Sequence, residues 1–125
     1  MTSRLKTWIA AALWLAAGCA AAADLPSSLS GRWSLRTFNQ KFALDDIQDK
    51  GDGTFAAKLT WWTKDSKCAL RSVPVTGQIT DKGIRWNATT ACKVPFEAEL
   101  VRGDGGWEGT AKSTNPAVEM ALTAK

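Results

Sequence analysis

The residue pair best suited to acid–base chemistry is Glu97 and Glu99. Two positions apart on one strand, they share a face from which two carboxylates could act on one substrate. Their neighbours Phe96, Ala98 and Leu100 take the opposite, inward face, so we expect both carboxylates to face water. The chain has no His, which excludes Ser-His-Asp and Cys-His catalysis. We therefore predict that the protein is not an enzyme.

A run of aspartates in the segment DDIQDKGDG could offer oxygen ligands to a hard cation such as calcium. The spacing of Asp45, Asp46, Asp49 and Asp52 does not match the Asp-x-Asp-x-Asp-Gly loop, and no Glu follows at the twelfth position. The stretch Gly51–Gly53 is typical of a hairpin turn. The sequence therefore predicts no metal site, and it indicates no cofactor.

Indole rings are the best candidates for ligand contacts, because they stack on sugars and anchor protein partners. Adjacent Trp61 and Trp62 cannot both be buried on the same face of a strand, so one of them projects outward unless a loop covers it. An outward Trp62 would lie beside Lys58 and Thr60. The alternative is that the Trp62 ring lies along the wall of the domain or under the turn at Lys64–Lys67. The candidate ligand-binding residues are Trp33, Trp62, Trp86 and Trp107.

Three cysteines are present, of which Cys19 lies near the N-terminus and Cys68 and Cys92 in the body of the chain. There is no Cys-x-x-Cys motif, and two thiolates without His make an incomplete zinc site. An exported domain of this size pairs its cysteines in an oxidising compartment. We therefore predict a Cys68–Cys92 disulfide.

Residues 1–23 have the three parts of a secretory signal peptide: basic Arg4 and Lys6, the apolar run Trp8–Ala17, and small residues up to Ala23. The apolar run is about half as long as a membrane-spanning helix. Cleavage after Ala23 would release a soluble chain. We expect a periplasmic or secreted bacterial protein.

A second cleavage route remains open, because Leu15–Cys19 resembles the lipobox of bacterial lipoproteins. In that alternative Cys19 is lipidated and the protein is an outer-membrane lipoprotein. Membrane contact is expected only if Cys19 is acylated.

Beyond the leader, we expect an N-terminal arm over residues 24–30 and one domain over residues 31–125. The whole chain has 16 basic and 12 acidic side chains, and removing Arg4 and Lys6 leaves 14 against 12, a net charge of +2. No short window holds more than two Lys or Arg residues. The charge pattern therefore predicts no nucleic-acid partner.

Apolar residues alternate with polar ones almost everywhere, and Gly, Asp, Asn or Pro interrupts the pattern at short intervals. This pattern is typical of short antiparallel strands. Strands joined by tight turns close most simply into an all-β, up-and-down barrel of about eight strands. A break at Pro74 would make a ninth. The predicted strands are Gly31–Phe38, Lys41–Ile47, Thr54–Thr63, Cys68–Val73, Val75–Thr80, Ile84–Thr89, Phe96–Arg102, Trp107–Lys112 and Ala117–Ala124.

The alternation also predicts which side chains enter the barrel. They are numerous enough to fill an eight-stranded barrel, whose interior otherwise holds one small ligand. The inward set is Trp33, Leu35, Phe42, Leu44, Phe55, Ala57, Leu59, Trp61, Ile84, Trp86, Phe96, Ala98, Leu100, Val118, Met120 and Leu122.

Two short motifs resemble known families. Gly31-Arg32-Trp33 resembles the Gly-x-Trp opening of the calycins (lipocalins and avidins), a likeness that implies a Trp closing one end of the barrel. The stretch Leu25–Leu35 is similar to the start of small secreted inhibitors of bacterial metalloproteases, a likeness that implies an arm entering a protease cleft.

These observations predict an exported, non-catalytic β-barrel that binds a small molecule, lipid or glycan in its interior or on its Trp62 face. One alternative is a protease-inhibitor type of module, which binds a secreted or envelope protein through the arm of residues 24–30. Another is an envelope lipoprotein anchored through Cys19.

Overall fold

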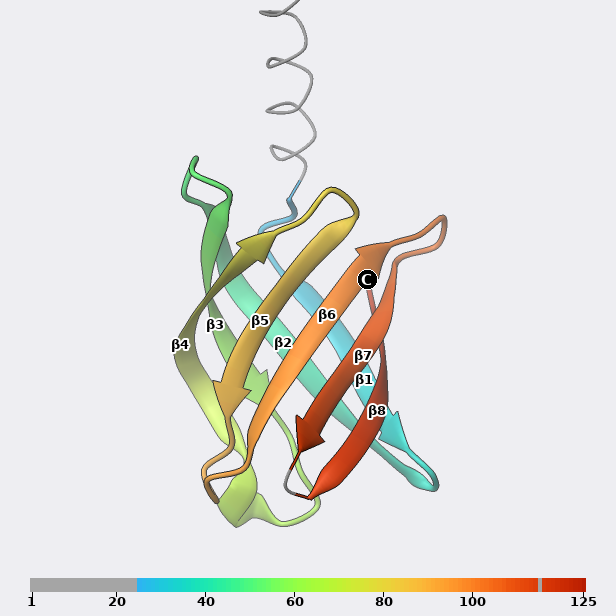
Figure 1. Cartoon of the computed structure of the whole chain (residues 1–125). Coiled ribbons are helices and arrows are strands. Elements are labelled where there is room, and N and C mark those ends of the chain that lie inside the picture. Colours follow the sequence, from blue (N-terminus) through green and yellow to red (C-terminus); the bar gives the residue numbers. More distant parts are fainter. Residues whose placement is uncertain (1–24, 115) are drawn as a thin grey trace, which may run out of the picture.

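The computed structural model describes residues 25–114 and 116–125, which form a closed eight-stranded barrel (Figure 1). Within them, no helix is long and apolar enough to span a membrane. The predicted signal peptide, the lipidation site Cys19 and the first arm residue Asp24 lie outside the described residues. The strands are β1 (Leu29–Leu35), β2 (Phe38–Asp49), β3 (Thr54–Trp61), β4 (Leu70–Ile79), β5 (Gly83–Thr89), β6 (Pro95–Arg102), β7 (Trp107–Thr114) and β8 (Ala117–Ala124), with a short 3₁₀ turn η1 (Ser66–Cys68) before β4.

Each strand pairs antiparallel with its neighbours in sequence, and β1 pairs with β8 to close the barrel. In the closing pair Trp33 lies opposite Leu122. The predicted all-β up-and-down barrel is confirmed. Because no strand crosses over another, consecutive connections lie at alternate ends of the barrel (Figure 1).

The barrel wall is weakest between β4 and β5, which pair at only three positions, Gly77 to Ile79 on β4. The predicted break at Pro74 is wrong, since β4 continues through it. Backbone N–H groups alternate in direction along a strand, and Thr80 N donates toward β5, to Gly83 O at 2.8 Å. The same alternation directs the nitrogen of Pro74 toward β5, where β4 has no ladder partner. A missing N–H costs nothing there.

The Cys68–Cys92 disulfide closes this seam below the three paired positions. Cys68 lies two residues before β4 begins, and Cys92 lies in the connection that follows β5; their Cα atoms are 4.7 Å apart. Ala91 N also donates to Cys68 O at 3.2 Å. The predicted disulfide is confirmed, and it holds together two strands that share few ladder hydrogen bonds.

Inward-facing side chains form one continuous core. Phe55, Leu59 and Trp61 of β3 are almost completely buried, as the alternation predicts. Leu35, Val118 and Met120 are only partly buried. The other predicted inward residues are all buried, so large side chains occupy the interior of the barrel.

Strand β1 begins at Leu29, two residues before the predicted domain boundary, and Leu29 is buried in the core. Ser27 O accepts a hydrogen bond from Ile47 N at 2.9 Å, and Leu25 packs against the core. Ser30 and Lys125 exchange two backbone hydrogen bonds. The described part of the predicted arm is therefore held against the barrel.

Candidate functional site

The alternating connections give the barrel two chemically different ends (Figure 1). We call one the basic end; it carries the uncharged β7–β8 connection and three charged connections, β1–β2, β3–β4 and β5–β6, at residues 36–37, 62–69 and 90–94. We call the other the glycine end; it carries the connections at residues 50–53, 80–82 and 103–106. The first and last described residues, Leu25 and Lys125, also lie at the glycine end.

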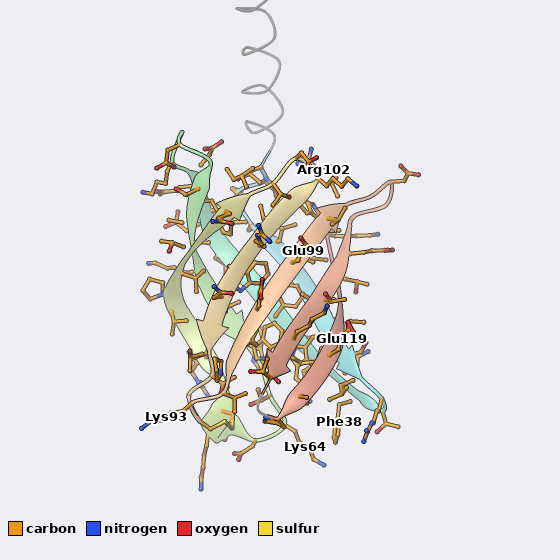
Figure 2. The ribbon with its side chains drawn as sticks, viewed as in Figure 1. Phe38, Lys64, Lys93, Glu99, Arg102 and Glu119 are labelled. Atoms are coloured by element: carbon orange, nitrogen blue, oxygen red, sulfur yellow. A yellow bond between two sulfur atoms is a disulfide. The ribbon has the colours of Figure 1, made fainter. Side chains whose placement is uncertain are left out.

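Four exposed cations gather at the basic end, where the three connections contain Arg36, Lys64, Lys67 and Lys93. Their only acid is Asp65, so four positive charges against one negative give a net charge of +3. Figure 2 shows Lys64 and Lys93 at this end, far from Arg102 at the other. The three connections of the glycine end instead contain three acids and two bases, Asp52, Asp81, Asp104, Lys50 and Lys82.

Two large hydrophobic side chains are exposed at the same end of the barrel. Phe38, the first residue of β2, is 41% exposed, and Trp62, just after β3, is 44% exposed. The ammonium of Lys64 lies 5.1 Å from the centre of the Phe38 ring, within cation–π range. The predicted outward position of Trp62 is confirmed.

A buried tryptophan fixes the backbone of Trp62. The indole nitrogen of Trp33 donates to Trp62 O at 2.8 Å, and Trp62 N donates to Lys41 O at 3.1 Å. The Trp33 ring is stacked parallel on Trp61, with 5.6 Å between ring centres. Trp33 therefore acts as a positioning residue for the exposed Trp62.

An aromatic layer closes the barrel beneath the basic end. Trp61 lies at its centre, with ring centres 5.6 Å from Phe42 and 4.7 Å from Phe96 in addition to Trp33. Offset and tilted aromatic pairs of this kind add stability beyond the burial of their area. The exposed connections are thus supported by a layer of closely packed aromatic rings.

The disulfide brings two of the cations together, because Lys67 precedes Cys68 and Lys93 follows Cys92. The carboxylate of Asp65 accepts a hydrogen bond from Lys67 N at 3.0 Å and so caps the short turn η1. The one acid at this end therefore organises the turn that carries a lysine.

Two of the cations occupy backbone conformations that other residues adopt more easily. Arg36 has φ of 56° at the first position of a two-residue hairpin turn, and Lys93 has φ of 68° at the end of its connection. Such turn positions normally carry Gly or Asn. An ordinary side chain in the left-handed region costs roughly 1 to 2 kcal/mol.

The other two predicted tryptophans lie elsewhere. Trp86 is 2% exposed inside the barrel, and its indole nitrogen has no hydrogen-bond acceptor among the described residues. Trp107 is buried at the glycine end, where the guanidinium of Arg102 lies 4.9 Å from its ring centre. The structure brings only Trp33 and Trp62 together, so the four tryptophans do not form one site.

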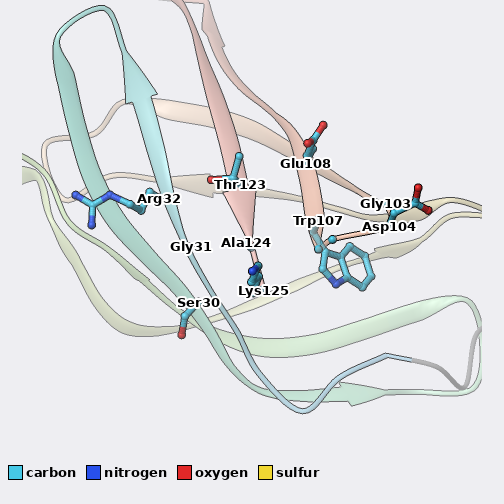
Figure 3. Close-up of a pocket in the computed structure, with 12 residues that line it drawn as sticks. Ser30, Gly31, Arg32, Gly103, Asp104, Trp107, Glu108, Thr123, Ala124 and Lys125 are labelled. Carbon is cyan, nitrogen blue, oxygen red and sulfur yellow. The ribbon is translucent and has the colours of Figure 1, made fainter.

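Open depressions lie on the outside of the wall. One, of about 430 Å³, lies at the glycine end and is lined by Arg32, Trp107 and Thr123, with the loop at residues 103–106 (Figure 3). Another, of about 520 Å³, lies beside the β4–β5 seam and includes Glu97. Glu97 and Glu99 are exposed, and the expectation that they face water is confirmed.

The aspartates of the β2–β3 connection serve the hairpin. Asp49 Oδ1 accepts from Gly51 N at 2.8 Å, and Asp52 Oδ1 accepts from Thr54 N at 3.1 Å and Thr54 Oγ1 at 2.5 Å. The hydrogen bonds from Thr54 hold the pKa of Asp52 below its usual value. Across residues 25–114 and 116–125, no group of three His, Cys, Asp or Glu side chains is arranged to hold a metal.

Sequence reasoning missed the basic end, because its cations come from three separate connections and form no cluster along the chain. The signal that could have found them is the meander itself, in which every second connection reaches the same end of the barrel. Reading the charges of alternate connections together would have separated the two ends.

No protein-family model matches this chain, and no curated protein or solved structure shows significant similarity to it.

Proposed function

We propose that the protein is an exported, non-catalytic binding barrel that engages an anionic ligand through its basic end. The observation that carries this proposal is the grouping of two exposed aromatic side chains, Phe38 and Trp62, with a net charge of +3. Exposed aromatic residues are enriched where proteins bind partners, and clustered cations attract anions. Export depends on the predicted leader at residues 1–23.

The barrel is consistent with a calycin-like fold, but its packing favours a surface ligand over an interior one. Trp86, Phe42 and Phe55 are among the large side chains buried within it. A ligand pocket in the interior would require these side chains to move. The described arm residues also favour the basic end over an inhibitor-type arm, because Leu29 is buried in β1 and Ser27 is hydrogen-bonded to β2.

The basic end has the preorganisation that a binding surface needs. The disulfide fixes the two connections that carry Lys67 and Lys93, and the Trp33 indole holds the backbone of Trp62. The backbone of these connections therefore has little conformational freedom to lose on binding, and this favours affinity. Arg36 and Lys93 both have positive φ, and this backbone conformation fixes the direction in which each side chain leaves its connection.

The test is a binding assay on the protein expressed from its full coding sequence. The probes are alginate and anionic phospholipid vesicles as anionic ligands, dextran as a neutral glycan, and a fluorescent fatty acid for the interior. We expect binding to at least one anionic probe, and its loss in the Lys67→Glu/Lys93→Glu variant. The matched control is Lys50→Glu/Lys82→Glu, which changes the net charge equally at the glycine end.

Two results would overturn the proposal. One is the absence of binding to both anionic probes. The other is an equal loss of binding in the two double variants, since that would mean that total charge matters and the basic end does not. Binding of the fatty acid alone, unchanged in both variants, would favour an interior site.

A further inference from the structure

We propose that the anionic ligand is a lipid surface, on which the barrel docks end-on through its basic end. In this arrangement Phe38 and Trp62 enter the boundary between headgroups and acyl chains, while the four cations contact the phosphates. The inference rests on the proposed function and specifies its ligand class.

The basic end combines exposed aromatic side chains with cations. Aromatic rings with cations close by are the combination found where proteins meet a membrane interface, since the rings prefer the interfacial region and the cations prefer anionic headgroups. The basic end presents both residue types close together. The Lys64 ammonium lies over the ring of Phe38, the first residue of β2, and Trp62 is two residues before Lys64 in the β3–β4 connection.

The geometry of Lys64 and Phe38 suits partial insertion. The ammonium lies 5.1 Å from the ring centre, so the lysine stem runs beside an apolar surface. Lysine can bury its aliphatic stem while keeping its charged group in a polar layer. As the ring enters the membrane interface, the ammonium can remain among the phosphates.

The shape of the surface also favours a flat ligand. Besides the two depressions described above, one of about 400 Å³ lies on the wall near the basic end, between β5, β6 and β7. Phe38, Trp62, Lys64 and Lys93 line none of the three. Lys64 and Lys93 instead stand in connections at one pole of the barrel (Figure 2), and the connections of Arg36 and Lys67 lie at the same pole. A broad, flat ligand can contact several connections together, whereas a small molecule or a single polymer strand is better held in a groove.

The described ends of the chain leave the basic end free to approach a membrane. Leu25 and Lys125 lie at the glycine end, and Ser30 and Lys125 are hydrogen-bonded there. Docking through the basic end therefore leaves the described ends of the chain pointing away from the membrane, where they obstruct nothing.

The main experiment is sedimentation with vesicles of phosphatidylcholine alone or mixed with phosphatidylglycerol. Each basic residue near an anionic surface changes membrane partitioning about five-fold. We expect binding to the anionic vesicles only, a fall of about 25-fold in Lys67→Gln/Lys93→Gln, and a change of less than about two-fold in the matched control Lys50→Gln/Lys82→Gln. Raising the salt concentration should also release the protein, because exposed charges are screened.

Fluorescence tests the insertion directly. Of the five tryptophans in the described residues, only Trp62 is exposed, while Trp33, Trp61, Trp86 and Trp107 are buried. In protein from which the leader with Trp8 and Trp14 has been removed, a blue shift of emission on vesicle binding, and quenching by brominated lipid, therefore report on Trp62. Both signals should disappear in Trp62→Phe, which keeps an aromatic ring and so should keep most of the binding. Unchanged melting temperatures establish that the variants remain folded.

The outcomes separate the two proposals. Binding to alginate without binding to anionic vesicles would overturn the lipid inference and leave the proposed function standing. Binding to neither would overturn both. Equal binding to neutral and anionic vesicles, or vesicle binding without a change in Trp62 fluorescence, would also contradict end-on docking on an anionic membrane.

Discussion

The two ends of the barrel solve the same problem, reversing a strand, with different residues. At the glycine end the left-handed positions are held by Gly51 and Gly53, with φ of 84° and 88°. At the basic end they are held by Arg36 and Lys93, which pay a steric penalty that glycine avoids. Left-handed side chains also occur within strands, at Asp46 of β2 and Ser72 of β4, so the conformation alone does not mark a contact surface. Among the connections, the difference teaches that the glycine end follows backbone preference, whereas the basic end places charged side chains where glycine would be favoured.

The ends also differ beneath their connections. The basic end has the aromatic layer around Trp61 and the Cys68–Cys92 disulfide. The glycine end depends on hairpin hydrogen bonds such as those of Asp52 and on the backbone pairing of Ser30 with Lys125. The end with the candidate binding chemistry therefore has the firmer support.

The largest effect should come from breaking the aromatic layer. Trp61→Ala removes a fully buried ring that contacts Trp33, Phe42 and Phe96, and we expect a loss of about 4 kcal/mol in the free energy of unfolding, measured by urea denaturation. Trp107→Ala at the glycine end should cost less, because that ring lacks comparable aromatic neighbours among the described residues. An equal or larger cost for Trp107→Ala would contradict the difference in support.

Reduction of the disulfide should have the next largest effect. The loop that it closes corresponds to about 3.5 kcal/mol of chain entropy, which should be lost on adding a reductant. Amide exchange should then accelerate at Ala91 and the other basic-end connections more than at the glycine end. The Cys68→Ser/Cys92→Ser variant should have the stability of the reduced protein, and a reductant should not change it. Uniform acceleration at both ends would show that the bridge does not support the basic end specifically.

Exchanging the turn residues should give effects of opposite sign. Arg36→Gly relieves a left-handed side chain and should raise the free energy of unfolding by up to about 1 kcal/mol, while Gly51→Ala should lower it by about the same amount. Thermal unfolding checks both. The sharper expectation is that Arg36→Gly gains stability and loses affinity for anionic vesicles. If Arg36→Gly is more stable but binds vesicles with unchanged affinity, Arg36 does not contribute to binding.

The smallest effect should be a pH dependence at the glycine end. The hydrogen bonds from Thr54 lower the pKa of Asp52, so ionised Asp52 stabilises the folded state. This contribution is complete above the ordinary pKa of 3.8 and is lost as the pH falls through the lower folded value. The difference in urea midpoint between the native protein and Asp52→Ala should therefore shrink below pH 3.8. A difference that is constant down to strongly acidic pH would contradict this assignment.

The fold was largely predictable because its determinants are local. Alternation along β3 places Phe55, Leu59 and Trp61 inside, and short turns leave a meander few ways to close. Pro74 misled the prediction because its effect depends on a neighbour: a proline breaks a ladder only where its nitrogen faces a paired strand, and here it faces the open part of the β4–β5 seam.

The candidate site was predictable only in part. Adjacency of Trp61 and Trp62 on a strand with one solvated face is enough to predict that one ring points outward. The charge grouping is a property of the closed barrel, which carries Arg36, Lys64 and Lys93 to one pole from positions far apart in sequence. Local patterns cannot show such a grouping until the topology is known.

The position of Leu25 and Lys125 at the pole opposite the cations has one further consequence. Six of the eight strands have seven or eight residues, and strands of that length, tilted as in a small barrel, separate the poles by about 20 Å. A chain acylated at Cys19 would be tethered from its glycine end and would hold the cations out toward a second surface, as a spacer between two layers. The same chain released after Ala23 would have a single contact face. The same barrel would thus connect two surfaces or bind to one as a peripheral protein, depending on which bond of the leader is cut.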